Sequence, residues 1–247
     1  MALINDVMAV IGQTGCFRCD RTLDLYKTAT GNGLVTQAAA GRQLSVLEVV
    51  ADQAIYIRLC EDDYPGWLPL SKIEALSRRE SKPYIAPVLT AADIQARIPQ
   101  VLAFAQAAMA VPNEYHWGGT VAPNYDCSGL TQAAFAAAGI WLPRDSYQQE
   151  AFAQPIAVPD LQPGDLIFFG PPERTTHVAL HQGQGRYLHS SGKDQGRNGI
   201  GVDSLRDLSH PVSQRYYEQL RGCGRVTRSY QPTGSPIATR RDVIPQR

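Results

Sequence analysis

The chain lacks an excess of charge of either sign, because 23 Lys and Arg residues balance 23 Asp and Glu residues among its 247 positions. A protein that binds nucleic acid usually carries a basic face, so this balance argues against nucleic acid as the main partner. A solvated terminus explains the basic residues from Arg221 onward. Long apolar runs are also missing, because the longest, 101–111, is interrupted by Gln106 and is too short to span a bilayer. We therefore expect neither nucleic acid nor a membrane as partner.

The chain also lacks the even number of cysteines that is typical of a disulfide-bonded protein. The chain has five, at positions 16, 19, 60, 127 and 223, and an odd number favours free thiols in a reducing compartment. Cys16 and Cys19 form a CxxC pair without a second pair or a nearby histidine, which is a weak zinc signal. We expect neither a metal nor another cofactor. Residues 1–8 lack the basic start of a secretory signal peptide, so we expect a cytoplasmic protein.

Local patterns predict two domains of different kinds. Short alternating segments between residues 20 and 75 are typical of strands in a small barrel. Helical patterns follow, beginning at the N-cap candidate Thr90 with Asp93 three residues on, and a kink or split is expected at Pro99. Strand patterns dominate from Ile156, and helices followed by strands are typical of an α+β domain. The expected boundaries are a barrel at 16–76, a linker at 77–89, an α+β domain at 90–228 and a C-terminal tail at 229–247.

A cysteine lies at the expected first turn of a helix. The segment Asp126-Cys127-Ser128-Gly129 precedes apolar residues that recur at helical spacing up to the natural stop Gly139. Unpaired N–H groups and the positive dipole end at a helix start favour a thiolate, so Cys127 is a candidate nucleophile. The alternative from the residues alone is a small buried apolar side chain.

Two segments that carry histidine predict a β-hairpin. Residues 177–181 and 186–191 alternate like strands, and the glycine-rich piece between them is typical of a turn. With a three-residue loop at 183–185, Ala179 would lie opposite His189. One face of this hairpin would then offer several imidazoles, so that one could orient another beside a cysteine nucleophile.

The hairpin alone does not decide which histidine would be the base. His177 and His181 are both diagonal neighbours of His189 on the same face in that register. A lone histidine is more often a structural residue, and we expect that role for His116 and His210.

The order and approximate spacing of the motifs over about residues 90–225 resemble the NlpC-type bacterial cell-wall cysteine peptidases, which are compact papain-like α+β domains. The motifs are Tyr115-His116-Trp117-Gly118-Gly119, Asp126-Cys127-Ser128-Gly129-Leu130, Pro163-Gly164-Asp165-Leu166-Ile167-Phe168-Phe169, His177-Val178-Ala179-Leu180 and His189. The resemblance implies that Cys127 is the nucleophile, His177 the base and His189 the residue that orients the base. It also implies that Tyr115 lies beside the nucleophile, as a hydroxyl donor near the oxyanion.

The N-terminal region carries a second resemblance. The segment Tyr64-Pro65-Gly66-Trp67-Leu68, after an acidic turn, is similar to the end of bacterial SH3-type barrels that are joined to cell-wall enzymes. Relatives with such barrels require a free N-terminal L-alanine in the substrate. Their resemblance implies substrate-binding roles for Tyr64, Asp126, Ser128 and Ser146. For Asp126 a plain N-cap is the competing interpretation. Glu61, Asp62 and Asp63 are expected to be solvated turn charges.

Together the resemblances imply an endopeptidase that cleaves the γ-D-glutamyl–diamino acid bond of peptidoglycan stem peptides. Its partners would be free tripeptides and tetrapeptides met during cell-wall recycling, and the protein would be a monomer. An N-acetylmuramoyl-L-alanine amidase with the same Cys-His-His site, an acyltransferase and a non-catalytic wall-binding module are the alternatives. The diamino acid, diaminopimelate or lysine, is left open by the sequence.

Overall fold

The computed structural model describes residues 17–50, 53–78 and 84–237. The described residues fall into two compact units, divided between Ala86 and Pro87 and again between Ser229 and Tyr230. The first division lies inside the expected linker 77–89. The segment from Tyr230, expected to be a separate tail, groups with the N-terminal unit.

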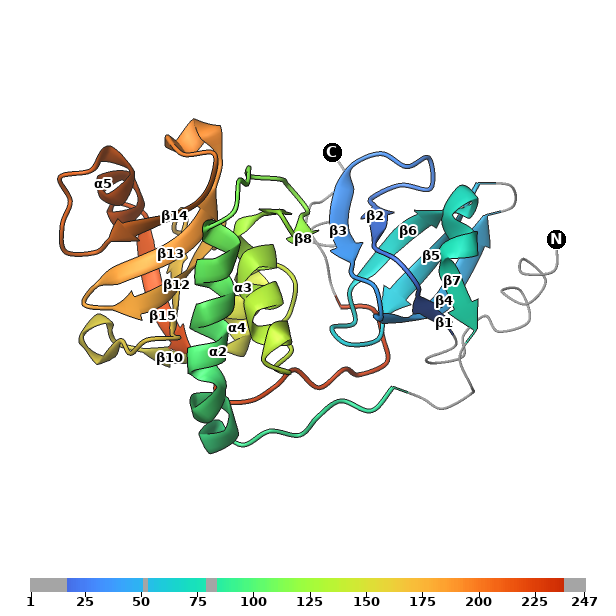
Figure 1. Cartoon of the computed structure of the whole chain (residues 1–247), viewed down its shortest axis with the longest axis horizontal. Helices are drawn as coiled ribbons and strands as arrows, with labels where there is room; N and C mark the ends of the chain where they lie inside the picture. The colour runs from blue at the N-terminus through green and yellow to red at the C-terminus, as the bar shows by residue number, and fades with distance from the viewer. Residues whose placement is uncertain (1–16, 51–52, 79–83, 238–247) are drawn as a thin grey trace. The chain divides into compact units, whose positions relative to one another are not determined.

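The N-terminal unit is a curled antiparallel sheet of the SH3-like kind (Figure 1). Its strands are paired in the order β3-β2-β6-β5-β4-β1-β7. The elements are β1 (Phe17–Cys19), β2 (Leu23–Tyr26), β3 (Leu34–Ala38), β4 (Gln43–Val50), β5 (Ala54–Leu59), β6 (Pro65–Pro69), a 3₁₀ turn η1 (Leu70–Ala75) and β7 (Leu76–Arg78). Alternate residues point inward, so that Leu25, Ile55 and Ile57 are fully buried in its core.

The second unit has an α+β fold. It comprises α2 (Ala91–Met109), β8 (Thr120–Val121), β9 (Asn124–Tyr125), α3 (Cys127–Ala137), α4 (Ser146–Phe152), β10 (Gln154–Ile156), a 3₁₀ turn η2 (Val158–Asp160), β11 (Leu166–Phe169), β12 (His177–Gly183), β13 (Arg186–Ser191), a 3₁₀ turn η3 (Lys193–Gln195), β14 (Gly199–Ser204), α5 (Pro211–Tyr217) and β15 (Leu220–Arg225). Six of the strands form an antiparallel sheet in the order β10-β15-β11-β12-β13-β14.

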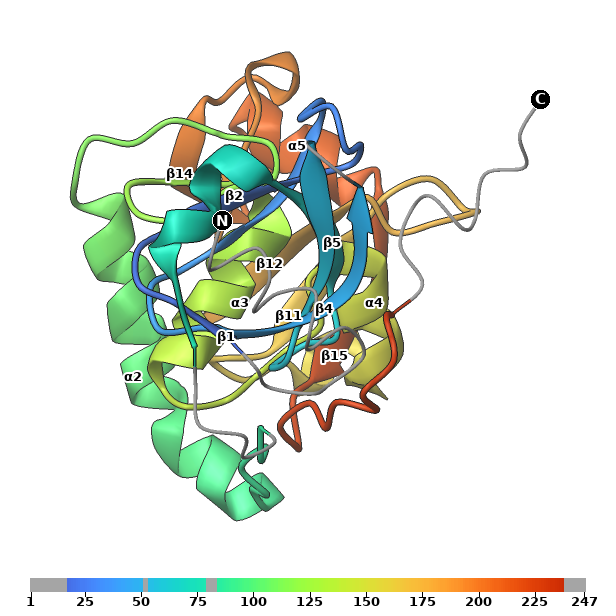
Figure 2. The same cartoon turned by 90° about the vertical axis from the view of Figure 1, so that its right-hand side faces the viewer.

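Both faces of this sheet are covered, which explains why its central strands are apolar on both sides. Leu166 and Phe168 of β11 pack into a core shared with α2 and α3, whereas Ile167 and Phe169 pack into a second core that includes Tyr216 of α5. In both views α2 and α3 lie side by side (Figures 1 and 2). The start of α3 is therefore fixed against the sheet by a packed layer.

The start of α2 agrees with the sequence, but its middle does not. Thr90 caps the helix, and Asp93 returns a hydrogen bond to the Thr90 N–H as a capping box. The helix continues through Pro99 over 19 residues, so the expected split is wrong, because burial of Ile94, Ile98 and Val101 holds both halves on one face. Among the described helices, none has the length and apolar character needed to cross a membrane.

The β12–β13 hairpin has the expected register but not the expected loop. His181 lies opposite Tyr187, while Gly183 lies opposite Arg186 after a bulge. The loop is therefore the two residues Gln184 and Gly185, both with positive φ, and not the three-residue loop 183–185. A two-residue turn of this kind matches the natural twist of the strands, and the bulge restores the register. Ladder pairs run from Leu180 opposite Leu188 towards the turn.

Candidate functional site

Cys127 is the first residue of α3, as the sequence predicts. The Asp126 carboxylate caps the helix by accepting from the Gly129 N–H at 2.7 Å. The Cys127 side chain is buried, and its sulfur accepts hydrogen bonds from the Val178 and Ser128 N–H groups. Val178 directly follows His177 in β12, so the thiol lies against the strand that carries the expected base.

The two expected histidines are brought together. His177 Nε2 lies 2.8 Å from His189 Nδ1, and both side chains are buried. His177 begins β12 and His189 lies in the middle of β13, so the pair is created by the packing of neighbouring strands.

The next partner in the site is Asp203 of β14, which was not among the residues expected from the sequence. His189 Nε2 lies 2.8 Å from Asp203 Oδ2, and the carboxylate also pairs with Arg197 at 2.7 Å. Asp203 lies opposite Tyr187, and Gly201, two residues earlier in β14, lies opposite His189. The alternation of residues along these strands was the only sequence signal that could have pointed to Asp203. No local motif marks it, because the contact depends on pairing between β13 and β14.

Tyr216 of α5 fixes the two imidazole rings from the second core. Its ring stacks on His177 with a centroid distance of 4.4 Å and meets His189 edge-on at 4.8 Å. Its hydroxyl is held by the Ser191 hydroxyl at 2.7 Å. Such packing leaves the imidazoles little freedom to rotate.

Burial dominates the electrostatics of the site. It raises the pKa of the Cys127 thiol to about 12, and Asp126 raises it further, while N–H donors and Arg144 lower it. Burial also lowers the pKa of His177 well below 6.5, with a further contribution from His189. The expectation that the helix start favours a thiolate is therefore wrong for this buried side chain. The N–H donors are present, but they do not outweigh the loss of water around the sulfur.

The Asp126 carboxylate is fully engaged within the protein. Arg144, which was not among the expected site residues, donates to Asp126 Oδ1 at 3.1 Å and to Oδ2 at 2.7 Å. The Gly118 N–H donates at 2.9 Å, and the Ser128 hydroxyl lies 3.3 Å away. Arg144 also donates to the Ser128 hydroxyl at 2.9 Å. The N-cap interpretation is confirmed, and the ammonium-binding role stays a prediction.

Tyr115 lies within electrostatic reach of the nucleophile. Burial raises the pKa of its phenol, and Cys127 and Asp126 raise it further. The phenol is therefore a neutral hydrogen-bond donor at ordinary pH, which is the form that the expected role requires.

Two family models match the chain, one in each of its two units. Residues 112–221 match the NlpC/P60 family, and residues 25–73 match the bacterial dipeptidyl-peptidase Sh3 domain. The chain carries an NlpC/P60 domain and a bacterial SH3 domain. The NlpC/P60 match contains Cys127, His177, His189 and Asp203.

Curated relatives match the NlpC/P60 part. A probable endopeptidase p60 of Listeria seeligeri is 33% identical over 122 residues, which are 49% of this chain and 21% of that protein. A probable endopeptidase of Corynebacterium glutamicum is 32% identical over 132 residues, covering 52% of this chain and 61% of that protein. The chain thus spans about a fifth of the length of the Listeria relative.

Solved structures of two NlpC/P60-type proteins are similar to this chain. An NlpC/P60 family protein from Bacillus cereus covers 90% of this chain and 66% of its own, with 21% identity and a TM-score of 0.46. A peptidoglycan hydrolase from Mycobacterium tuberculosis covers 59% of this chain and 74% of its own, with 25% identity and a TM-score of 0.45.

His181 is not part of the His177–His189 pair. It is buried, and its Nδ1 lies 2.9 Å from the backbone oxygen of Gln162. That contact ties β12 to the loop before β11, which is a structural role.

Ser146 begins α4 and is buried. The same helix is bound to α3, because the Gln149 amide donates to the Ser128 carbonyl at 3.0 Å and its oxygen accepts from the Thr131 hydroxyl at 2.7 Å. Ser146 and Ser128 therefore lie on two helices that the NlpC/P60 domain holds together.

Tyr64 lies in the SH3 domain, where it is buried. The acidic residues before it were expected to be solvated, and this is wrong. Glu61 and Asp62 are buried beside Arg42, while Asp63 pairs with the buried Arg58. Buried arginines supply the partners that water would otherwise provide.

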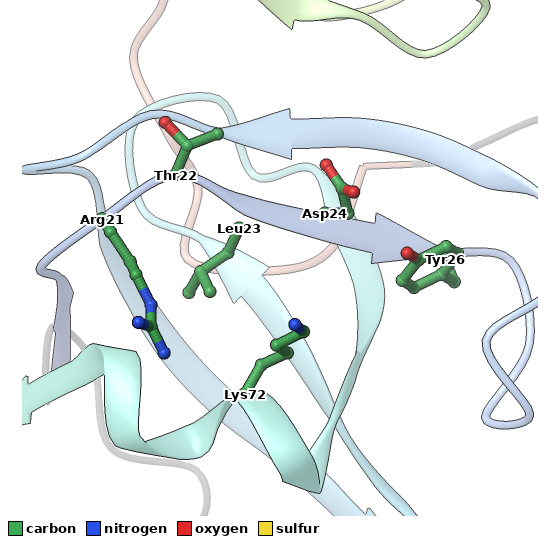
Figure 3. Close-up of a pocket in the computed structure, with 6 residues that line it drawn as sticks. All are labelled: Arg21, Thr22, Leu23, Asp24, Tyr26 and Lys72. Carbon is green, nitrogen blue, oxygen red and sulfur yellow. The ribbon is translucent and has the colours of Figure 1, made fainter.

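The SH3 domain also has a hollow of about 350 Å³ that contains none of the expected site residues. Figure 3 shows its lining, which is Arg21, Thr22, Leu23, Asp24, Tyr26 and Lys72. Among the described residues no cluster of His, Cys, Asp and Glu has the composition of a metal site. Cys16 of the CxxC pair lies outside the described residues, and Cys19 is a buried free thiol.

Proposed function

We propose that this protein is a cysteine endopeptidase that hydrolyses peptidoglycan stem peptides at the γ-D-glutamyl–diamino acid bond. The observation that carries the proposal is the position of the Cys127 thiol against the backbone of Val178, next to the paired imidazoles of His177 and His189. The endopeptidase names of the relatives of the NlpC/P60 domain support the same reaction class.

The reaction begins with a neutral Cys127 thiol and a neutral His177 imidazole. As Cys127 Sγ forms a bond to the γ-carbonyl carbon of D-glutamate, the thiol proton passes to His177. The carbonyl oxygen becomes an oxyanion, for which the Cys127 N–H at the helix start and the Tyr115 hydroxyl are the expected donors. His177 then returns the proton to the amine of the diamino acid as the C–N bond breaks.

Water completes the cycle. It attacks the γ-glutamyl thioester and gives its proton to His177, and the C–S bond breaks as that proton returns to sulfur. The products are a peptide ending in free D-glutamate and an amine on the diamino acid. Both protons are accounted for by one imidazole, so no cofactor enters the steps.

A free N-terminal L-alanine is part of the proposal. The matched SH3 family is described as that of bacterial dipeptidyl peptidases, which supports release of a dipeptide, here L-Ala-γ-D-Glu. Tyr64, Ser128 and Ser146 would contact this dipeptide. Asp126 would have to share its carboxylate between Arg144 and the ammonium group.

The decisive experiment compares three substrates by mass spectrometry. They are free L-Ala-γ-D-Glu-diamino acid, the same peptide N-acetylated, and the peptide attached to muramic acid, each with diaminopimelate and with lysine. We expect L-Ala-γ-D-Glu from the free peptides alone, with Cys127→Ala as the inactive control. Release of muramic acid from the stem would instead identify an amidase. If every substrate remains intact, the result would support the alternative of a non-catalytic binding module.

A role on released peptides follows from this specificity. We expect little cleavage of intact cross-linked sacculi, because their stem peptides have no free alanine amine. Efficient solubilisation of sacculi would contradict the recycling role.

A further inference from the structure

Asp203 closes a line of hydrogen-bonded side chains that starts at His177. Three consecutive sheet strands supply them, His177 from β12, His189 from β13 and Asp203 from β14. The two heavy-atom distances along the line are both 2.8 Å, and the three side chains are buried. Each proton on the line can therefore be assigned from the chemistry of its neighbours.

The assignment begins at the carboxylate. An ionised Asp203 can only accept, so the proton shared with His189 lies on His189 Nε2. Burial lowers the pKa of His189, which keeps this imidazole neutral and leaves its Nδ1 with a lone pair. The facing atom, His177 Nε2, must then carry a proton and donate it. In the neutral His177 ring the remaining lone pair lies on Nδ1.

We propose that Asp203 is a positioning residue of the site, which fixes the proton of His189 on Nε2 and, through His189, leaves Nδ1 of His177 as the atom that accepts the Cys127 proton. This inference rests on the proposed cysteine-peptidase function. It adds a fourth residue to the set and names the basic nitrogen. The negative charge of Asp203 also stabilises the imidazolium that forms on His177 during attack.

The surroundings of Asp203 suit a fixed, ionised carboxylate. Its Oδ2 accepts from Arg197 Nε at 3.1 Å and Nη2 at 2.7 Å, and its Oδ1 accepts from the Ser213 hydroxyl at 3.0 Å. His210 Nδ1 lies 3.5 Å from Oδ1. Burial raises the pKa of Asp203, but the bond from His189, the charge of Arg197 and the bond from Ser213 together hold it below the usual value.

Other groups around the two imidazoles do not supply a competing acceptor. Tyr216 and Tyr187 meet the rings through their aromatic faces and edges, with centroid distances of 4.4 to 5.2 Å. Burial raises the pKa of both phenols, so they are neutral beside the rings.

Two substitutions separate position from charge. In Asp203→Asn, Arg197 would hold the amide oxygen at the Oδ2 place, so the His189 proton stays on Nε2 while the charge is lost. Asp203→Ala removes both. Asp207→Asn is the matched control, because it removes a carboxylate four residues further on, after the end of β14, whose partner is Ser209 and not a histidine.

The first test is long-range ¹H–¹⁵N NMR of the protein labelled at histidine, with signals assigned by removing each histidine in turn. We expect His177 and His189 both as Nε2–H tautomers in the wild type and in Asp207→Asn. In Asp203→Ala we expect at least one to change tautomer. An Nδ1–H tautomer at either histidine of the wild type would overturn the proposal.

The second test is the rate at which iodoacetamide alkylates Cys127, followed by peptide mass spectrometry. This rate needs no substrate, so it distinguishes a wrong relay from a wrong choice of cleaved bond. We expect Asp203→Asn to lower it by about tenfold and Asp203→Ala by more, with melting temperatures showing that both variants fold. Wild-type alkylation rates in both variants would refute the role of Asp203, even if the peptide hydrolysis proposed above proved correct.

Discussion

His177 and His181 lie on the same face of one strand and are both buried, yet only one belongs to the candidate site. His177 is placed at the first position of β12, where the neighbouring strand and α5 supply His189 and Tyr216. His181 faces the loop before β11 instead and bonds the Gln162 carbonyl. The two histidines are only four residues apart along the strand, and their different neighbours make one the expected base and the other a structural residue.

Exchange of each histidine should separate activity from stability. We expect His177→Ala to lower kcat/KM on the free tripeptide by roughly 100-fold or more, because the base is lost. His181→Ala should lower the free energy of unfolding by about 1–3 kcal/mol, because a buried bond is lost, and it should retain most activity. Urea denaturation and steady-state kinetics on both variants check this. An active His177→Ala beside an inactive His181→Ala would reverse the assignment.

The pH profile of kcat/KM reports the same residues. A lowered pKa means that His177 keeps its basic form to well below pH 6.5, so the acid limb should lie below that value. The rate should then stay level through neutral pH, since the pKa of the Cys127 thiol is raised to about 12. Stopped-flow hydrolysis over the pH range measures both. An acid limb at or above pH 6.5 would contradict the neutral base.

At the scale of elements, the start of α3 is fitted against the short hairpin of β8 and β9. The Asp126 N–H donates to the Gly119 carbonyl at 3.1 Å, and the Gly118 N–H donates back to the Asp126 side chain. Gly129, in the first turn, lies directly over the same Gly119 carbonyl. This close approach of two backbones sets the height of Cys127 against β12.

Gly129→Ala should therefore damage the site although alanine favours helices. A Cβ at Gly129 would lie far inside van der Waals contact with the Gly119 carbonyl oxygen. We expect a loss of stability of about 1–3 kcal/mol and a loss of most activity, because α3 must shift. Thermal unfolding and tripeptide hydrolysis measure the two effects.

Gly222→Ala is the matched control, since a Cβ at this β15 position meets no atom within 4 Å. It should change stability by no more than about 0.5 kcal/mol. Equal behaviour of the two alanine variants would mean that the Gly119 contact does not position the helix.

At the scale of the whole molecule, the chain returns to its N-terminal unit after completing the NlpC/P60 domain. The Thr233 N–H donates to Asp63 Oδ2 at 2.6 Å, and the Tyr230 hydroxyl donates to the same oxygen at 3.2 Å. Asp63 is buried and also pairs with Arg58. One carboxylate thus joins the β5–β6 turn to a segment that is more than 160 residues away in sequence.

Asp63→Asn should destabilise this unit strongly. It leaves the buried Arg58 without its ionised partner, for which we expect a loss of about 3 kcal/mol. Urea denaturation followed by tryptophan fluorescence would measure it. Asp24→Asn, at an exposed position where the carboxylate accepts from the Gln37 amide, should cost no more than about 0.5 kcal/mol. Similar losses in both variants would show that the buried pair of Asp63 and Arg58 does not stabilise this unit.

Local sequence determined the parts of the protein that depend on neighbours along the chain. The capping box of Thr90 and Asp93, the N-cap at Asp126 and the helix that begins at Cys127 were all readable from spacing, because caps join groups two or three residues apart. The α+β class and the SH3-like fold followed from the order of periodic segments and from the family motifs.

Only the tertiary structure decided what depends on strand pairing and burial. Asp203 reaches His189 through a neighbouring strand, and Arg144 reaches Asp126 from a loop 18 residues away, so neither is marked by a local pattern. The turn acids of the SH3 domain became buried ion pairs for the same reason. Burial also overrode the effect of the helix start on Cys127, because the loss of water around a thiolate costs more than a few N–H donors return.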